Sequence, residues 1–299
     1  MHNKIPIPQR CTTADKRTFG TVLGIGGSRG MAGAVAMAGK SALLAGAGLV
    51  QLAVPDPVLE TVAGFYPEYT TIPCPADAAG RFSLQALPTL LECAGNAASV
   101  FIGPGLGRSS ELTQLIGQFL QQAVCPVVID ADALQREIFE QHNGNNVTNN
   151  NATKKETAFI LTPHCGEFAR LTGKSVPPEE QPVQRQETAS AAALKFAEKH
   201  PAVLVLKGHR SIITDGSRLE LNTTGNPGMA TGGSGDVLTG LIAGLLAQRL
   251  MPVFDTVCLA VHLHGSAGDS AAAELGELSV TATAILAHIP AAMRIASGG

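Results

Sequence analysis

A glycine-rich stretch directly before an apolar run is the part of this sequence best suited to chemistry. The residues Gly232, Gly233, Ser234 and Gly235 precede Asp236 and the run Val-Leu-Thr-Gly-Leu. Glycines allow successive backbone N–H groups to point at one spot. The start of a helix adds its own free N–H groups and the positive end of its dipole. The segment therefore predicts an anion-binding turn suited to a phosphate.

Asp236 follows this turn in the first turn of the expected helix. A carboxylate beside a phosphate is repelled by it, so we expect a chemical role: accepting a proton from a hydroxyl whose oxygen attacks phosphorus. The alternative is a helix cap, which stabilises by about 1 kcal/mol. The turn is not a Walker loop, because no Gly-Lys-Ser/Thr follows, and Gly24–Gly30 lacks the dinucleotide-binding pattern.

The elements that must position this turn alternate along the chain. Apolar runs predict strands, and Ala-rich or amphipathic segments between them predict helices, which is typical of βαβ units and a largely parallel sheet. The last third changes to three successive helices. The expected strands are 21–26, 49–54, 98–102, 126–130, 158–162 and 202–206, and the expected helices are 32–47, 109–123, 183–199, 234–250, 254–274 and 279–295.

Composition excludes several classes of protein. Charged residues make up 15% of the 299 residues and the formal net charge is −3, so a nucleic-acid partner is not expected. No apolar stretch reaches the length of a membrane span, and residues 1–10 have no apolar run, so no secretory signal is expected. The six cysteines form no CxxC pair, which predicts free thiols in a reducing cytoplasm and no metal site built from protein ligands.

We expect one domain over residues 1–299. Residues 1–15 are interpreted as an N-terminal extension. The Asn-rich segment 142–155 has almost no apolar content, so it is interpreted as a solvent-exposed loop insertion.

From about Lys16 to Ile295 the chain resembles the ADP/ATP-dependent NAD(P)H-hydrate dehydratases of nicotinamide nucleotide repair, which belong to the ribokinase-like superfamily. Each motif is weak alone, but their order and spacing are specific. The motifs are Gly26-Gly-Ser-Arg-Gly-Met-Ala-Gly-Ala34, Gly46-Ala-Gly-Leu-Val, Gly103-Pro-Gly-Leu-Gly107, Asp130-Ala-Asp-Ala-Leu, Leu161-Thr-Pro-His-Cys-Gly-Glu167, Val205-Leu-Lys-Gly-His-Arg-Ser211 and Thr231-Gly-Gly-Ser-Gly-Asp236.

This resemblance implies a three-layer α/β/α fold with a mostly parallel central sheet. It implies that ADP or ATP, with Mg²⁺, phosphorylates the hydroxyl of the S-epimer of hydrated NADH or NADPH. Phosphate then leaves, which restores the reduced nucleotide. Phosphorylation supplies a better leaving group than hydroxide. The resemblance does not decide between the donors, although free-standing bacterial members favour ADP, and it implies a homotetramer.

The resemblance also assigns roles to residues. Asp236 is the base and a substrate contact. Gly232, Gly233, Ser234 and Gly235 bind the phosphate, and Gly235 also contacts the nucleotide. The remaining nucleotide contacts are Lys207, Gly208, His209, Arg210 and Ser211, and the remaining substrate contacts are Ala34, Gly105 and His164.

Each role has a plainer alternative. Residues 207–211 could be an ordinary turn between strands 202–206 and 211–214, and Gly105 could serve only a tight turn. Ala34 could be core packing. His164 could form hydrogen bonds only within its own turn. Cys165 stands where the family has proline, and this departure predicts a looser turn.

Several neighbouring polar residues are interpreted structurally. Asp130 and Asp132 could orient a magnesium-bound water or cap the following helix, and for Asp132 the cap is favoured. Glu167 could assist magnesium in this superfamily. His262 and His264 are expected to be buried hydrogen-bonding groups between helices.

Two other functions are alternatives to the dehydratase. One is a ribokinase-like kinase that phosphorylates a vitamin precursor or a sugar hydroxyl and releases a stable ester. The other is a non-catalytic nucleotide-binding or scaffold protein. Family members also occur behind an epimerase domain. Because the motifs here start near residue 20, we expect dehydratase activity without epimerase activity.

Overall fold

Short apolar runs that end at turns form the central strands of the protein. The computed structural model describes residues 12–142, 157–173, 182–200 and 202–298. The predicted runs correspond to β1 (Thr21–Ile25), β2 (Leu49–Pro55), β4 (Ser99–Ile102), β5 (Val127–Ile129), β6 (Phe159–Leu161) and β7 (Val203–Leu206). The predicted Asn-rich loop lies outside the described residues apart from His142, as do residues 1–11 of the expected extension.

Within the described residues the strands form a nine-stranded sheet in the order β3-β2-β1-β4-β5-β6-β7-β8-β9. Neighbouring strands are parallel from β3 to β7, whereas β8 and β9 are antiparallel. The prediction of a mostly parallel sheet is confirmed. The strand considered at 211–214 corresponds to β8 (Ile212–Thr214), and the strands that were not predicted are β3 (Thr70–Cys74) and β9 (Leu219–Leu221).

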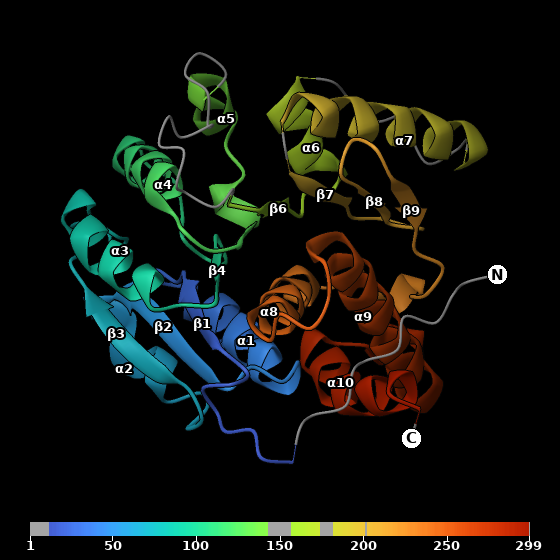
Figure 1. The fold of residues 1–299 in the computed structure, drawn as a ribbon, viewed down its shortest axis with the longest axis horizontal. Coiled ribbons are helices and arrows are strands. Elements are labelled where there is room, and N and C mark those ends of the chain that lie inside the picture. Colours follow the sequence, from blue (N-terminus) through green and yellow to red (C-terminus); the bar gives the residue numbers. More distant parts are fainter. Residues whose placement is uncertain (1–11, 143–156, 174–181, 201, 299) are drawn as a thin grey trace.

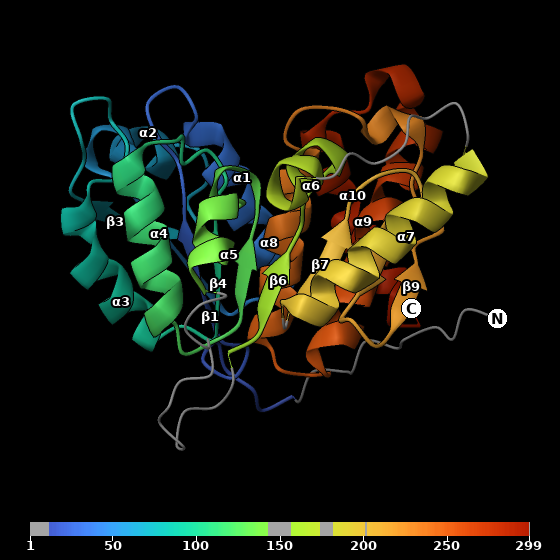
Figure 2. The same cartoon turned by 90° about the horizontal axis from the view of Figure 1, so that it is seen from above.

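Helices cover both faces of the sheet, as Figures 1 and 2 show. Because side chains alternate along a strand, Val22 of β1 joins one core while Leu23 joins the other. The first core is covered by α1 (Ala32–Leu44), α2 (Leu59–Ala63), α8 (Ser234–Ala247), α9 (Val253–Leu275) and α10 (Ala282–Ala296). The second is covered by α3 (Leu87–Gly95), α4 (Ser110–Gln122), α5 (Arg136–His142), α6 (Cys165–Thr172) and α7 (Pro182–Lys199).

The abundance of glycine and alanine is explained partly by the contact between α1 and α8. A β-carbon at Gly240 of α8 would lie 1.9 Å from the carbonyl oxygen of Ala38 in α1, and one at Gly244 would lie 2.4 Å from that of Ala42. Only glycine allows the two helix backbones to approach this closely. The contact fixes α8, and with it the glycine-rich turn, against the sheet.

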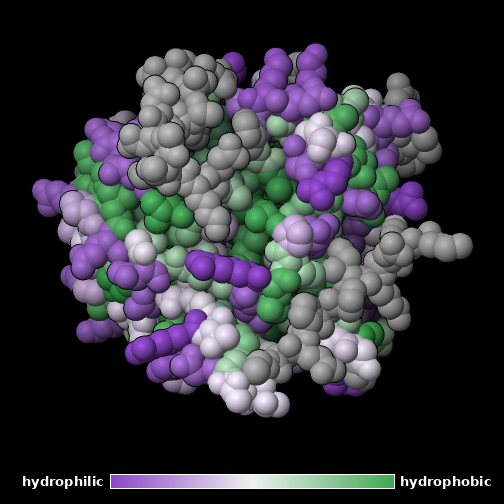
Figure 3. Space-filling model, viewed as in Figure 1, coloured by the Kyte–Doolittle hydropathy of each residue, from purple (hydrophilic) through white to green (hydrophobic). Residues whose placement is uncertain are grey.

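The surface of the protein is not uniformly polar. Figure 3 shows apolar side chains in the middle of one face, with polar side chains around them. Among the described helices, none is both long and apolar enough to cross a membrane.

Candidate active site

The predicted turn at the start of α8 has a backbone conformation that favours glycine. Gly233 has φ +89° and stands immediately before α8, which begins at Ser234. A β-carbon at Gly233 would lie 2.7 Å from Cε of Met37. Among the described residues, no backbone acceptor is found for the N–H groups of Gly232, Gly233, Gly235 and Asp236. These donors and the positive end of the helix dipole form a site for an anion.

Asp236 lies in the first turn of α8 and is half-buried. Burial and the Asp130 carboxylate raise the pKa of Asp236 to about 7, against the opposing effect of the Lys207 ammonium. No side chain of the described residues caps α8 through a hydrogen bond, so Asp236 does not act as the helix cap considered above. A carboxyl group that titrates near neutral pH is suited to accept a proton during a reaction.

The ammonium group of Lys207 lies beside this turn. Lys207 follows β7, and its Nζ donates to Oδ1 of Asp130 at 2.8 Å. A β-carbon at Gly235 would lie only 3.1 Å from this Nζ, so glycine leaves the space that the ammonium occupies. Burial acts to lower the pKa of Lys207, but the carboxylates of Asp130 and Glu167 outweigh it and the net shift is upward. Lys207 therefore adds a fixed positive charge at the anion site.

Asp130 holds Lys207 in place from the end of β5. Its side chain is almost fully buried, and residue 130 is 1% exposed. Oδ2 of Asp130 accepts a hydrogen bond at 2.7 Å from the hydroxyl of Thr239, one turn after Asp236 in α8. Thr239 was not among the predicted site residues. The available signal was a hydroxyl three residues after Asp236 in an otherwise apolar helix.

His164 directly precedes α6 and caps it. Nδ1 of His164 accepts hydrogen bonds from the backbone N–H groups of Gly166 at 3.0 Å and Glu167 at 3.3 Å. Oε2 of Glu167 accepts from the backbone N–H of His164 at 2.8 Å, which completes a capping box. His164 therefore does form hydrogen bonds within its own turn. Its side chain is nevertheless 54% exposed. A substrate contact through the rest of the ring stays a prediction.

Cys165 does not loosen this turn, so that expectation is wrong. Its Sγ lies 3.8 Å from the carbonyl oxygen of Lys207, to which the thiol donates. The backbone N–H of Lys207 donates to the carbonyl of Pro163 at 2.8 Å. These contacts tie the start of α6 to the end of β7, which brings His164 and Lys207 to the same edge of the sheet.

The loop after β4 packs on the start of α1. Gly105 is buried, has φ +67° and would place a β-carbon 2.5 Å from the carbonyl of Met31 and 3.2 Å from Cβ of Ala34. The Ser28 hydroxyl donates to the carbonyl of Gly105 at 2.8 Å. Ala34 and Gly105 are thus brought together. The tight turn is observed, and the substrate contacts of both residues stay predictions.

Asp132 does not cap a helix, so the favoured interpretation of this residue is wrong. Its Oδ2 accepts from the backbone N–H of Gly107 at 2.9 Å, and its Oδ1 lies 3.3 Å from Nε of Arg108. Asp132 follows β5, and its carboxylate contacts donors on the neighbouring loop. It therefore fixes that loop and does not cap a helix. Asp132 thereby holds the loop containing Gly105.

Residues 207–211 form the turn between β7 and β8. Gly208, His209 and Arg210 are exposed, and Arg210 has φ +55°. Ser211 closes the turn, because its hydroxyl donates to the carbonyl of Gly208 at 3.1 Å. The backbone of residues 207–211 is therefore the ordinary turn considered above. The nucleotide contacts of these residues stay predictions.

The two histidines of α9 differ from each other. His264 is buried, and its Nε2 lies 3.5 Å from the hydroxyl of Ser234. Burial lowers the pKa of His264 to about 4, so its ring is neutral at pH 7. His262 is exposed, and the expectation of burial is wrong for this residue. His264 therefore contacts the first residue of α8.

This fold and site define a class of protein: a ribokinase-like α/β protein whose helix start has free N–H groups, a neighbouring ammonium and a half-buried carboxyl group. The family model described as NAD(P)H-hydrate dehydratase matches residues 22–291. The chain belongs to the NAD(P)H-hydrate dehydratase family.

Curated relatives agree with this assignment. A bifunctional NAD(P)H-hydrate repair enzyme of Moorella thermoacetica is 40% identical over 290 residues, which cover 96% of this chain and 52% of that relative. The ADP-dependent (S)-NAD(P)H-hydrate dehydratase of Bacillus subtilis is 34% identical over 289 residues, covering 96% and 92%. The chain thus spans about half the length of the bifunctional relatives, and the expectation of dehydratase activity without epimerase activity stays a prediction.

Solved structures agree as well. The ADP/ATP-dependent NAD(P)H-hydrate dehydratase of Bacillus subtilis, co-crystallised with ATP/Mg²⁺, superposes with TM-score 0.80 at 28% identity, covering 98% of this chain and 95% of that one. A ribokinase-like superfamily protein of Enterococcus faecalis gives 0.79 at 30% identity, covering 99% and 94%. A hydroxyethylthiazole kinase of Pyrococcus horikoshii, with 0.60 at 15% identity over 92% and 89%, shares the fold.

Proposed function

We propose that this chain catalyses the nucleotide-dependent dehydration of the S-epimer of hydrated NADH and NADPH, converting ADP to AMP and phosphate or ATP to ADP and phosphate. One observation carries the proposal. Asp236, with a pKa raised to about 7, stands at the helix start where free N–H groups and the Lys207 ammonium converge. A base beside an anion site can activate a hydroxyl toward a phosphoryl group.

The reaction requires two steps. In the first, the ring hydroxyl oxygen bonds to the terminal phosphorus of the nucleotide, Asp236 takes the hydroxyl proton, and the bond from that phosphorus to the bridging oxygen breaks. In the second, the ring C–O bond breaks and phosphate leaves, while a proton is lost from the neighbouring ring carbon to restore the double bond. The N–H groups of Gly232, Gly233 and Gly235 and the Ser234 hydroxyl would stabilise the transferring phosphoryl group.

The nucleotide is proposed to bind along the turn 207–211. Lys207 would contact a phosphate as a point charge, and the exposed Gly208, His209 and Arg210 leave backbone and side chains accessible beside it. Ser211 would hold the turn. The hydrated cofactor is proposed to lie between Ala34, Gly105 and the exposed ring of His164, where small residues and a capping histidine border the same edge of the sheet.

The donor set around Asp236 does not fit a metal ion bound by the protein alone. Both oxygens of Asp130 accept hydrogen bonds, from Lys207 and Thr239, and Glu167 is engaged by the start of α6. The described residues contain no group of three His, Cys, Asp or Glu side chains that could hold a metal. We propose that Mg²⁺ is bound by nucleotide phosphates and water, and we derive no step through it.

A cytoplasmic homotetramer is proposed as the working form. The family resemblance supports the tetramer. The described cysteines are all free thiols, which suits a reducing compartment. Light scattering should give four times the chain mass of 30.7 kDa; a monomer mass would exclude this assembly.

The decisive experiment is a repair assay run in parallel with ADP and ATP. The S-epimer of hydrated NADH is mixed with protein, nucleotide and Mg²⁺, and the absorbance of the reduced nicotinamide is followed. We expect the absorbance to return with at least one donor, and the two rates decide between them. No recovery, together with a stable phosphate ester formed from another alcohol, would favour a ribokinase-like small-molecule kinase instead.

A further inference from the structure

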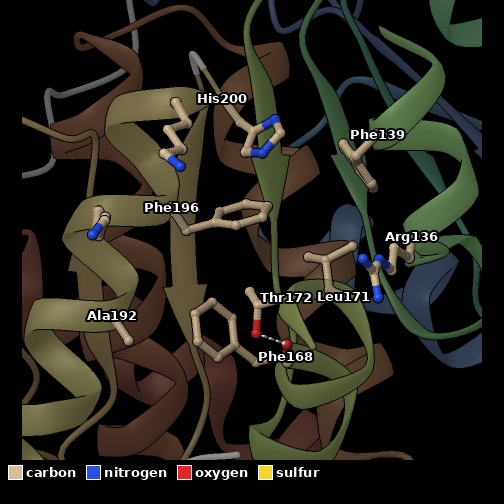
Figure 4. Close-up of a pocket in the computed structure, with 10 residues that line it drawn as sticks. Arg136, Phe139, Phe168, Leu171, Thr172, Ala192, Phe196 and His200 are labelled. Carbon is tan, nitrogen blue, oxygen red and sulfur yellow. Dashed lines mark hydrogen bonds between the residues drawn. The ribbon is translucent and has the colours of Figure 1, made fainter. Parts of the chain in front are cut away.

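A pocket with a volume of about 240 Å³ opens between α5, α6 and α7. Figure 4 shows the lining side chains. The pocket lies on the face of the sheet covered by α3 to α7, whereas Asp236 belongs to α8 on the opposite face. Nothing in the proposed reaction uses this pocket.

One wall of the pocket is aromatic. Phe196 of α7 lies with its ring centroid 4.4 Å from that of His200, at an interplanar angle of 31°. Phe168 of α6 meets Phe196 edge to face at 5.9 Å, and Phe139 of α5 meets His200 in the same way at 6.3 Å. Burial lowers the pKa of His200, so its neutral ring adds to the aromatic wall. Such a wall favours a flat apolar ring.

The rest of the lining is strongly positive. Arg136, Lys195 and Lys199 line the pocket, and no described lining residue is acidic. Lys195 and Lys199 stand one turn apart on α7, so their like charges repel each other. Among the described residues, no ion pair is found for Lys195 or Lys199. A bound anion would relieve this repulsion.

We propose that this pocket is a second ligand site, for a small aromatic carboxylate. The rings provide a surface for stacking, and Lys195 and Lys199 provide charge for the carboxylate. The volume is smaller than that of sites for drug-sized ligands, which begin near 300 Å³, so a molecule of one or two rings fits. The site stands independently of the proposed enzyme activity.

Binding is tested with the intact protein by titration calorimetry, using 2-naphthoate as the probe. Two matched compounds separate its parts: 2-naphthamide keeps the rings without the charge, and acetate keeps the charge without the rings. We expect 2-naphthoate to bind at least fivefold more tightly than either. Equal affinity for naphthoate and naphthamide, or no binding of naphthoate up to about 10 mM, would overturn the proposal.

Variants locate the site. Ala192 lines the pocket and the adjacent Ala191 is exposed without lining it. We expect Ala192→Phe to abolish naphthoate binding and Ala191→Phe to leave it unchanged, with both melting like the wild type. If Ala192→Phe binds naphthoate normally, the ligand sits elsewhere, for instance in the nucleotide site, and the proposal is wrong.

A second pair tests the charge. The double substitution Lys195→Gln/Lys199→Gln should weaken naphthoate binding about fivefold to tenfold while naphthamide binding stays the same. The control Lys16→Gln/Arg294→Gln removes two exposed charges far from the pocket and should change neither affinity. Equal weakening by both doubles would show a net-charge effect and reject this site.

Discussion

The ammonium of Lys207 lies 2.8 Å from the buried carboxylate of Asp130. Two strands end here, β5 before Asp130 and β7 before Lys207, and α8 contributes the Thr239 hydroxyl to the other carboxylate oxygen. This arrangement compensates the charge of Lys207 at a helix start that must also attract an anion. It also places a negative charge beside Asp236, which helps to raise the pKa of Asp236 to about 7.

Replacing Asp130 with asparagine tests this relationship. Removing one partner of a buried ion pair should lower the free energy of unfolding by about 3 kcal/mol. The loss of the neighbouring negative charge should lower the pKa of Asp236, so the acid limb of the pH–rate profile should move to lower pH. Urea unfolding and a pH series of the repair assay measure the two effects.

Thr239→Val is a milder change at the same site, to be compared with Asp130→Asn. It removes only one hydrogen bond to Asp130, so stability should fall by about 1 kcal/mol and the acid limb should move little. A pH profile unchanged in Asp130→Asn would contradict the electrostatic part of this interpretation, even if the variant were less stable.

Asp236→Asn tests the proposed base. The amide has nearly the same shape but cannot take a proton, so we expect turnover to fall by several orders of magnitude, on the order of 10³ or more. Nucleotide binding, measured by calorimetry, should be largely kept. Asp56→Asn, at an exposed position in the loop after β2, is the matched control and should retain full activity. A fall below about tenfold in Asp236→Asn would exclude the general-base role.

The raised pKa of Asp236 predicts two pH dependences. Activity should rise with pH up to about 7 and level off above it, because the base works only when ionised. The unfolded carboxyl titrates near 3.8, so the folded state binds the extra proton between about pH 4 and 7 and loses stability as pH rises through that range. Asp236→Asn should therefore gain melting temperature over the wild type at pH 8 but not at pH 4. An equal difference at both pH values would count against the shifted pKa.

Much of the fold was predictable because strands buried on both faces are continuous apolar runs. The runs 21–26 and 202–206 correspond to β1 and β7. The exceptions have physical reasons: β3 contains Pro73, which weakens a strand pattern, and β9 spans only Leu219–Leu221 at the sheet edge.

The part of the candidate site that is formed by the backbone was predictable from the sequence. The glycines before α8 predicted the turn because glycine readily adopts the left-handed backbone that Gly233 has at φ +89°. The partners of Asp130 and Asp132 were not predictable, because Thr239 lies 109 residues after Asp130 in sequence and Asp132 reaches back to Gly107. Contacts of this kind depend on how strand ends meet, which no local pattern encodes.

Gly233→Ala tests whether the turn needs its left-handed backbone. Alanine at φ +89° is strained, and its β-carbon would lie 2.7 Å from Met37, so stability should fall by about 1–2 kcal/mol and phosphate affinity should fall with it. Gly117→Ala is the matched substitution: it lies inside α4 with no neighbour within 4 Å and should raise stability by about 0.5–1 kcal/mol. Chemical denaturation of both variants gives the comparison, and a Gly233→Ala protein as stable as the wild type would contradict the strain.

Substitutions of His164 can separate its capping role from its proposed contact with substrate. Alanine removes the acceptor for the N–H groups of Gly166 and Glu167, so His164→Ala should cost about 1 kcal/mol of stability and also raise KM for the hydrated cofactor. Asparagine is among the best helix caps, so His164→Asn should recover the stability. If the exposed part of the ring contacts substrate, KM in His164→Asn should remain raised although the melting temperature is restored. Recovery of both quantities together would mean that His164 acts only by shaping the start of α6.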